Sequence, residues 1–223
     1  DAIPPATLPV VKDICGTTLS YTGPLQQLSL TNNFNLAVTT SPTAAPNVWY
    51  TDRYAPAGFA SPESFSGGNR LKQSINAADG PSGRPGAFST AFYNTQGRGF
   101  DVGAATDAVE IQLYVEAGWA ATNKRMAGLW GVAVDATNTI SGYPILEFNS
   151  DGNNPRFRAY DNGVWHDMGL PTGFAYDTWV TLKIRLLPSG QFLFSAGDKN
   201  YVSSEFTPPL STRLKSVILQ GHN

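Results

Sequence analysis

Residues 142–169, GYPILEFNSDGNNPRFRAYDNGVWHDMG, contain three short strand-like segments separated by two turns. The turns hold the dipeptides Asp151-Gly152 and Asn162-Gly163. These dipeptides favour tight hairpins, because Asn, Asp and Gly adopt a positive φ at little energetic cost. A tight hairpin joins antiparallel neighbours, so this stretch predicts an antiparallel sheet.

Alternation along these segments separates an apolar side from a polar side. The apolar side is predicted to face the core and consists of Leu146, Phe148, Phe157 and Ala159. The polar side is predicted to face outward and carries Glu147, Arg158 and Tyr160. In VWHDM, either Trp165 or His166 takes the outward direction. Because the hairpins make these strands neighbours, Glu147 and Arg158 are predicted to form a cross-strand pair.

The same period of two residues recurs along the rest of the chain. Residues 107–116 and 177–187 alternate strictly, and residues 125–135 are apolar on both sides, as in a central strand. Further strands are predicted at residues 26–40, 71–75, 87–94, 191–196, 200–204 and 214–220. Short strands at even spacing with Gly, Asn and Asp turns predict an all-β, antiparallel β-sandwich.

Composition and length agree with a β-sandwich. The chain has 223 residues with 22 Gly and 16 Pro, and only 14 % of its residues are charged. Such a composition suits short strands and many turns better than helical bundles. Residues 1–24 are predicted to form a Pro-rich arm, because three prolines within residues 1–11 disfavour a central strand. Residues 25–223 are predicted to form a single sandwich domain.

Charge and hydropathy exclude two classes of partner. The net charge is −2 and no run of Lys or Arg is present, so nucleic acid is not expected as a partner. No apolar stretch approaches the roughly 20 residues of a membrane helix, so no membrane insertion is expected. Low charge with abundant Asn, Ser, Thr, Gly and aromatic residues is typical of exported bacterial surface proteins, which predicts a secreted or cell-surface location.

Several segments resemble known proteins. Residues 176–202, YDTWVTLKIRLLPSGQFLFSAGDKNYV, resemble laminin-G-like, concanavalin-A-like jelly rolls, in which a strand opening at a Trp precedes a strand pair with a Gly-containing hairpin. A second resemblance is to exported bacterial proteins of the PEP-CTERM-associated type, mostly of unassigned function. It rests on WYTDRYAPAGF (49–59), residues 75–102, RMAGLWGVAVD (125–135), GYPILEFNSD (142–151) and VILQGHN (217–223).

Two departures from these relatives bear on assembly. No sorting tail is present in the sequence, and the relatives continue past the position of Asn223 into one more strand. A sandwich lacking that strand would expose an unpaired edge, which is a template for another chain. The N-terminal residues are expected to fill the gap within one molecule or in the next one, and the second case would make the protein a self-assembling filament subunit by strand exchange.

The resemblance implies an extended polysaccharide or surface glycan on the outer face of one sheet or on the loops between Trp49 and Phe100. Aromatic rings stack on the apolar faces of sugars, and polar side chains hydrogen-bond the hydroxyl groups. Lys183 and Arg185, together with Gln112, are expected to extend the same polar face. The candidate ligand-binding residues are Trp49, Tyr50, Arg53, Tyr114, Glu147, Arg158, Tyr160 and Trp165.

Two enzymatic alternatives use the same region. A polysaccharide lyase acting by β-elimination on a uronate-containing glycan needs a group that neutralises the carboxylate and a base for the α-proton. Arg158 with Gln112 would supply the first, and Tyr160 or His166 the second. A glycoside hydrolase needs two suitably spaced carboxylates. It is disfavoured, because Asn149 stands where the jelly-roll glucanases carry their middle acid.

No cofactor is required by either the binding or the lyase hypothesis, and Ca²⁺ is the one candidate ion. Asn149 and Asp151 would supply oxygen ligands for it, but no Asp-x-Asp-x-Asp spacing with a closing Glu accompanies them. With 2 His and 1 Cys, a zinc or copper site is not expected. The structural alternative for Glu147 and Arg158 is an exposed ion pair worth less than about 1 kcal/mol.

Overall fold

The computed structural model describes residues 11–12, 18–19, 33–75, 85–88, 96–120, 126–204 and 210–222. The chain divides into two compact units, Asp1–Thr31 and Asn32–Asn223. In the first unit, β1 (Val11–Lys12) pairs antiparallel with β2 (Thr18–Leu19). The predicted boundary between residues 24 and 25 lies outside the described residues.

The second unit contains a large sheet in which nine strands lie within the described residues. The central strand β9 pairs with β11 on one side and with β17 on the other, and all neighbouring pairs are antiparallel except β3 with β4. In spatial order the strands are β13 (Val164–Gly169), β12 (Arg156–Asp161), β11 (Ile145–Asn149), β9 (Met126–Val134), β17 (Arg213–His222), β7 (Gln96–Asp101), β4 (Trp49–Thr51) and β3 (Thr40–Ser41), and β10 (Ile140–Gly142) pairs with β9.

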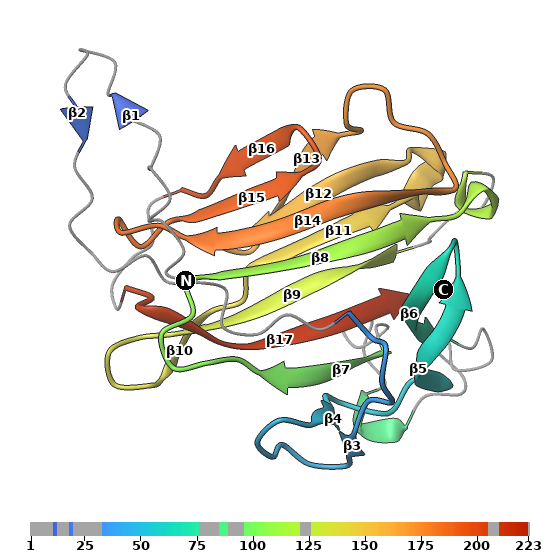
Figure 1. Ribbon diagram of the computed structural model, residues 1–223. Helices are drawn as coiled ribbons and strands as arrows, with labels where there is room; N and C mark the ends of the chain where they lie inside the picture. The colour runs from blue at the N-terminus through green and yellow to red at the C-terminus, as the bar shows by residue number, and fades with distance from the viewer. Residues whose placement is uncertain are drawn as a thin grey trace, which may run out of the picture. The chain divides into compact units, whose positions relative to one another are not determined.

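A smaller sheet packs on one face of the large sheet. Among the described residues it has four antiparallel strands, β16 (Lys199–Val202), β15 (Phe192–Ala196), β14 (Thr178–Leu186) and β8 (Ala108–Val115). It lies over β9, β11 and β12 in the view of Figure 1. A separate hairpin joins β5 (Gly58–Phe65) and β6 (Gly68–Ser74). The predicted fold class, an all-β antiparallel sandwich, is confirmed.

The core between the two sheets follows the predicted alternation. From the large sheet, Leu146, Phe148, Phe157 and Ala159 have no exposed surface, and they belong to one cluster with Leu182 and other residues of the small sheet. The cluster also contains Val109, Val115, Val180, Ile184, Leu186, Phe192, Phe194, Ala196 and Leu214. Each sheet therefore has an inner face toward this cluster and an outer face away from it.

The turns are where the sequence predicted them. Asn162 and Gly163 join β12 to β13 with φ of 50° and 90°, which is the left-handed backbone that their residue types favour. After β11, the predicted Asp-Gly turn is a short 3₁₀ segment, Asp151–Asn153. No helix within the described residues is long and apolar enough to cross a membrane.

Several elements differ from the prediction. β4, β5 and β7 were not predicted, because β4 has only three residues and because Gly, Pro and polar residues interrupt the apolar pattern of β5 and β7. Of the predicted strand at residues 26–40, the described part from residue 33 is extended chain that enters a strand only at Thr40. Of the predicted strand at residues 87–94, the described residues belong to the 3₁₀ segment Gly86–Phe88. β17 pairs with both β7 and β9. The expected strand exchange through an unpaired edge stays a prediction.

Candidate functional site

The outer face of the large sheet carries the polar residues that alternation placed there. Glu147 on β11 lies opposite Arg158 on β12, as predicted, and opposite Gly128 on β9. One pair further along, Tyr160 on β12 lies opposite Trp165 on β13. The outward residue of VWHDM is therefore Trp165.

This outer face has an apolar cluster of its own. It consists of Trp130, Val132, Ile145 and Ile218, each less than 10 % exposed, with Tyr160 and Trp165 packed against it. The rings of Tyr160 and Trp165 are 5.0 Å apart, and Tyr143 meets Trp130 edge-on at 6.0 Å. We name Tyr143, Tyr160 and Trp165 the aromatic wall. Its Tyr143 side chain is 45 % exposed, so the wall presents rings to solvent above a buried apolar base.

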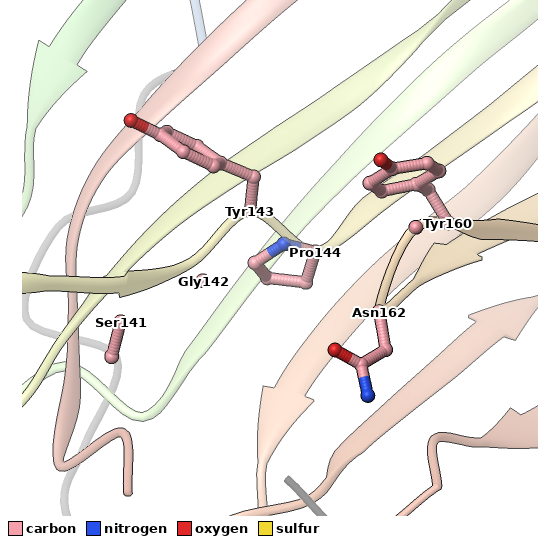
Figure 2. Close-up of a pocket in the computed structure, with 7 residues that line it drawn as sticks. Ser141, Gly142, Tyr143, Pro144, Tyr160 and Asn162 are labelled. Carbon is pink, nitrogen blue, oxygen red and sulfur yellow. The ribbon is translucent and has the colours of Figure 1, made fainter. Parts of the chain in front are cut away.

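A pocket of about 240 Å³ opens beside the aromatic wall. Figure 2 shows Pro144 between the rings of Tyr143 and Tyr160, whereas the Asn162 side chain extends from the turn away from the Tyr160 ring. Pro144 is buried and forms an apolar floor, whereas Asn162 is exposed at the turn between β12 and β13. The remaining lining residues are Ser141, Gly142 and Gly163. Two rings, an apolar floor and an amide are suited to stacking against a ring and hydrogen-bonding its substituents.

Glu147 lies on the same outer face as the aromatic wall, buried in a hydrogen-bonded network. Its Oε1 accepts a hydrogen bond from Arg158 Nε at 2.7 Å, and its Oε2 accepts one from Gln220 Nε2 at 2.9 Å. The Glu147 side chain is 0 % exposed and that of Arg158 is 15 % exposed. The guanidinium carbon of Arg158 lies 3.9 Å from the centroid of the Trp165 ring. The prediction of an exposed ion pair is therefore wrong for Glu147, since the apolar cluster and the neighbouring strands cover it.

Burial changes the acidity of this carboxyl group. Loss of solvent raises the pKa of Glu147 to about 7, although the charge of Arg158 and the hydrogen bonds from Arg158 and Gln220 act in the opposite direction. The carboxyl group is therefore ionised above about pH 7, where it forms an ion pair with Arg158. A change in its charge acts directly on Arg158, because the two side chains are in contact.

A second ion pair lies beside the first. Arg156 Nε is 2.7 Å from Asp167 Oδ1, and the Asp167 side chain is 55 % exposed. Asn149 Oδ1 accepts a hydrogen bond from the Asp151 N–H at 2.9 Å, so the Asn149 oxygen holds the turn after β11. No cluster of three or more His, Cys, Asp or Glu suited to a metal occurs within the residues that the structure describes. Ca²⁺ at Asn149 and Asp151 stays a prediction.

The predicted residues on β4 and in the loop after it divide between the two faces. Trp49 is buried and contacts Phe100, which packs against the inner core, so Trp49 does not line the outer face. Tyr50 lies on the outer face opposite Gly99 and donates a hydrogen bond to Asp101 at 2.9 Å. Burial raises the pKa of Tyr50 to about 12. Arg53 lies 4.8 Å from the centroid of the Trp130 ring and therefore joins the outer cluster.

Gln112 and Tyr114 do not join this site, contrary to the prediction of one continuous polar face. They lie on β8 and face away from the core on the outer face of the small sheet, where Gln112 is opposite Thr181. Tyr114 contacts Trp179 at 5.3 Å. Lys183 lies on that same face and pairs with Glu110. Periodicity assigns side chains to a face of their own strand but does not indicate which sheet the strand enters.

His166 is also separated from the aromatic wall. It lies opposite Ala159, a core residue, and its ring stacks on Tyr201 with centroids 4.5 Å apart. His166 therefore faces the small sheet, while Arg158 and Tyr160 face outward. The four groups of the lyase hypothesis, Arg158, Tyr160, His166 and Gln112, are divided among three surfaces.

Other residues of the site were not predicted. Alternation placed Tyr143 on the side of Glu147, which was the one signal that could have included it. Trp130 gave no signal, because its strand is apolar on both sides. Gln220 is 73 positions from Glu147 and reaches it because β17 lies next to β9. Such a contact requires knowledge of the strand order.

Comparison with known proteins gives limited information. No family model and no curated protein matches the chain. Among solved structures, the crystal structure of LamAcat from Zobellia galactanivorans is similar with a TM-score of 0.44 and 9 % sequence identity, over 88 % of this chain and 87 % of that chain. A likeness of this strength assigns neither a ligand nor an activity to the chain.

Proposed function

We propose that the protein binds a polysaccharide on the outer face of the large sheet, along the aromatic wall. The observation that carries this proposal is the pocket in which Pro144 lies between the rings of Tyr143 and Tyr160. The apolar faces of a sugar pack against such rings, and further sugar units would extend along the wall toward Trp165.

Polar groups at the rim complement the rings. Asn162 offers both a carbonyl oxygen and an NH₂ group at the pocket, and the hydroxyl groups of Tyr143 and Tyr160 donate and accept hydrogen bonds. Sugar hydroxyl groups need partners of both kinds. A few directed polar groups around an apolar base are typical of sites for small organic ligands. A secreted or cell-surface protein would meet such a polysaccharide outside the cell, and we include that location in the proposal.

Binding is favoured over β-elimination by the distribution of the candidate residues. A lyase would need Arg158, a proton-abstracting base and Gln112 around one sugar, and these side chains belong to separate surfaces. Arg158 is moreover paired with Glu147, so a substrate carboxylate would have to compete with Glu147 for it. Of the other candidate lyase residues, only Tyr160 lies on the same face as Arg158, two residues away on β12.

The proposal is tested by affinity electrophoresis and titration calorimetry against a panel of soluble polysaccharides. We expect the wild type to be retained by at least one polysaccharide. Tyr160→Ala should weaken that binding about tenfold or more, as for an aromatic contact at the centre of an interface. Tyr114→Ala is the matched control, because it removes the same side chain from the outer face of the small sheet, and it should bind like the wild type.

Two outcomes would contradict the proposal. The first is that no polysaccharide retains the wild type. The second is that Tyr160→Ala and Tyr114→Ala weaken binding equally, which would place the ligand elsewhere. Absorbance of unsaturated uronate products, followed in the same incubations, separates the lyase alternative: an increase that disappears in Tyr160→Phe would favour β-elimination.

A further inference from the structure

The aromatic wall belongs to strands on which the positive charges are already paired. Within β9 to β13, all of which the structure describes, Arg156 and Arg158 are the only Lys or Arg residues. Arg156 pairs with Asp167 and Arg158 with Glu147, each at 2.7 Å. These strands therefore present rings and hydroxyl groups without an uncompensated cation.

Arg158 is the cation on these strands that a ligand beside Trp165 would meet. Arg53, which lies over the Trp130 ring at 4.8 Å, is paired with Asp52 at 2.7 Å. The guanidinium group of Arg158 lies over the Trp165 ring at 3.9 Å and is partly exposed, whereas the carboxylate of Glu147 beneath it has no exposed surface. The Nε of Arg158 is used by Glu147, and its Nη2 lies 3.9 Å from Met126 Sδ. A ligand would thus contact Arg158 but not Glu147, and Glu147 would act on the ligand through Arg158.

This arrangement treats neutral and anionic sugars differently. A neutral sugar needs a ring surface and hydrogen-bonding partners, which the wall supplies. A uronate or sulfate group needs a cation that is free to form charge-assisted hydrogen bonds, and it is repelled by a carboxylate that already occupies that cation. Two carboxylates competing for one guanidinium group would also raise each other's pKa and lose charge.

We propose that the Glu147–Arg158 pair makes the aromatic wall selective for neutral polysaccharides over uronate-containing or sulfated ones, with Glu147 as a positioning residue for Arg158. The proposal rests on the proposed polysaccharide binding and specifies the chemical class of its ligand. It also gives the buried carboxylate a role that the stacking surface alone does not require.

Glu147→Gln tests the role of the pair, because glutamine keeps the shape and an oxygen acceptor for Arg158 Nε while leaving the guanidinium charge uncompensated. At pH 8, where Glu147 is ionised, and at low ionic strength, we expect its affinity for a polyuronate such as polygalacturonate to rise about tenfold, and its affinity for a neutral polysaccharide to stay within about twofold of the wild type. The gain should shrink in added salt, because salt screens partly exposed charges.

Glu110→Gln is the matched control. It makes the same change of charge and breaks the Lys183–Glu110 pair of 3.3 Å on the opposite outer face. Polyuronate affinity should not change in this variant. The gain seen in Glu147→Gln should disappear when Arg158→Gln is added, since the cation is then absent. The ratio of polyuronate affinity to neutral affinity is the decisive quantity, because a general loss of structure lowers both.

The wild type alone provides a test that needs no variant. Binding of polyuronate as tight as that of neutral polysaccharides would overturn the selectivity while leaving the proposed function intact. Equal gains in Glu147→Gln and Glu110→Gln would also overturn it, because net charge would then explain the change. Absence of binding to either class would instead contradict the proposed function itself.

Discussion

The two outer faces of the sandwich carry similar ion pairs in very different surroundings. On the small sheet, Lys183 and Glu110 lie on adjacent strands at 3.3 Å, with 39 % and 41 % of their side chains exposed. On the large sheet, Arg158 and Glu147 also lie on adjacent strands, at 2.7 Å, but Glu147 is completely buried. The same cross-strand pairing thus produces a solvated pair on one face and a desolvated pair on the other.

The surroundings explain this difference. Glu147 is on β11, which has a strand on both sides, and the cluster of Trp130, Ile145 and their neighbours fills the same face. Glu110 is on β8, which has β14 as its one partner among the described strands of its sheet. Exposed pairs contribute little to stability, whereas breaking a buried pair leaves a charge without solvent or partner. Equivalent substitutions on the two faces should therefore change the free energy of unfolding by different amounts.

The largest expected difference in stability between the two faces follows from removing the cation of each pair. Arg158→Ala leaves the carboxylate of Glu147 buried without its partner and removes the contact with Trp165, so we expect the free energy of unfolding at pH 8 to fall by about 3 kcal/mol. Lys183→Ala on the other face should lower it by less than about 1 kcal/mol. Urea unfolding of both variants measures the difference. Equal losses would show that the two faces do not differ as described.

The next effect is on the pH dependence of stability, to which the buried carboxyl group of Glu147 should contribute. The pKa of Glu147 is raised from 4.5 to about 7 in the folded protein, so the folded state holds a proton that the unfolded state releases. The stability from this group is fully present below about pH 4.5 and is lost as pH rises to about 7, by roughly 3 kcal/mol in total. The charged groups nearby are Arg158, Arg156 and Asp167.

Glu147→Gln isolates that contribution, because it lacks the titrating group. Unfolding free energies of the wild type and the variant should be compared at several values between pH 4.5 and pH 8. We expect the wild type to lose stability relative to the variant as pH rises. Parallel curves would contradict the raised pKa, and Glu110→Gln should give such parallel curves, since its site is solvated.

A smaller effect is expected at Gly128, where β9 passes close to β11. An added Cβ would lie 2.6 Å from Glu147 Cα and would also meet the Leu146 carbonyl oxygen. Gly128→Ala should therefore destabilise the protein by about 1–3 kcal/mol. Gly118→Ala is the control, because a Cβ there has no atom within 4 Å, and it should change stability by less than about 0.5 kcal/mol. Thermal unfolding of both variants measures this difference in stability. A neutral Gly128→Ala would mean that the strands can separate without loss.

Much of the fold could be predicted because strands and turns are local properties. The alternation in β8, β11, β12 and β14 identified which side chains enter the core, since a strand buried on one face must repeat every two residues. The Asn162-Gly163 turn fixed the pairing of Tyr160 with Trp165. Prediction failed for β4, β5 and β7, where distant partners stabilise strands that have weak local patterns.

The site could be predicted only within single hairpins. Glu147, Arg158, Tyr160 and Trp165 came together because two short turns connect their strands. Gln112, His166 and Trp49 did not, because each lies on another sheet or on the inner face. The burial of Glu147 depends on Gln220 and Trp130, which approach through strand order rather than sequence distance.

The sequence by itself determined the all-β sandwich, the inward and outward sides of its main strands and the Glu147–Arg158 pair, since these follow from residue types within a few positions of one another. The tertiary structure decided which outer face receives each strand, that the carboxylate of Glu147 is buried, and that Tyr143 and Tyr160 border one pocket. Solvent exposure depends on everything packed around a side chain, and strands distant in sequence supply most of that packing.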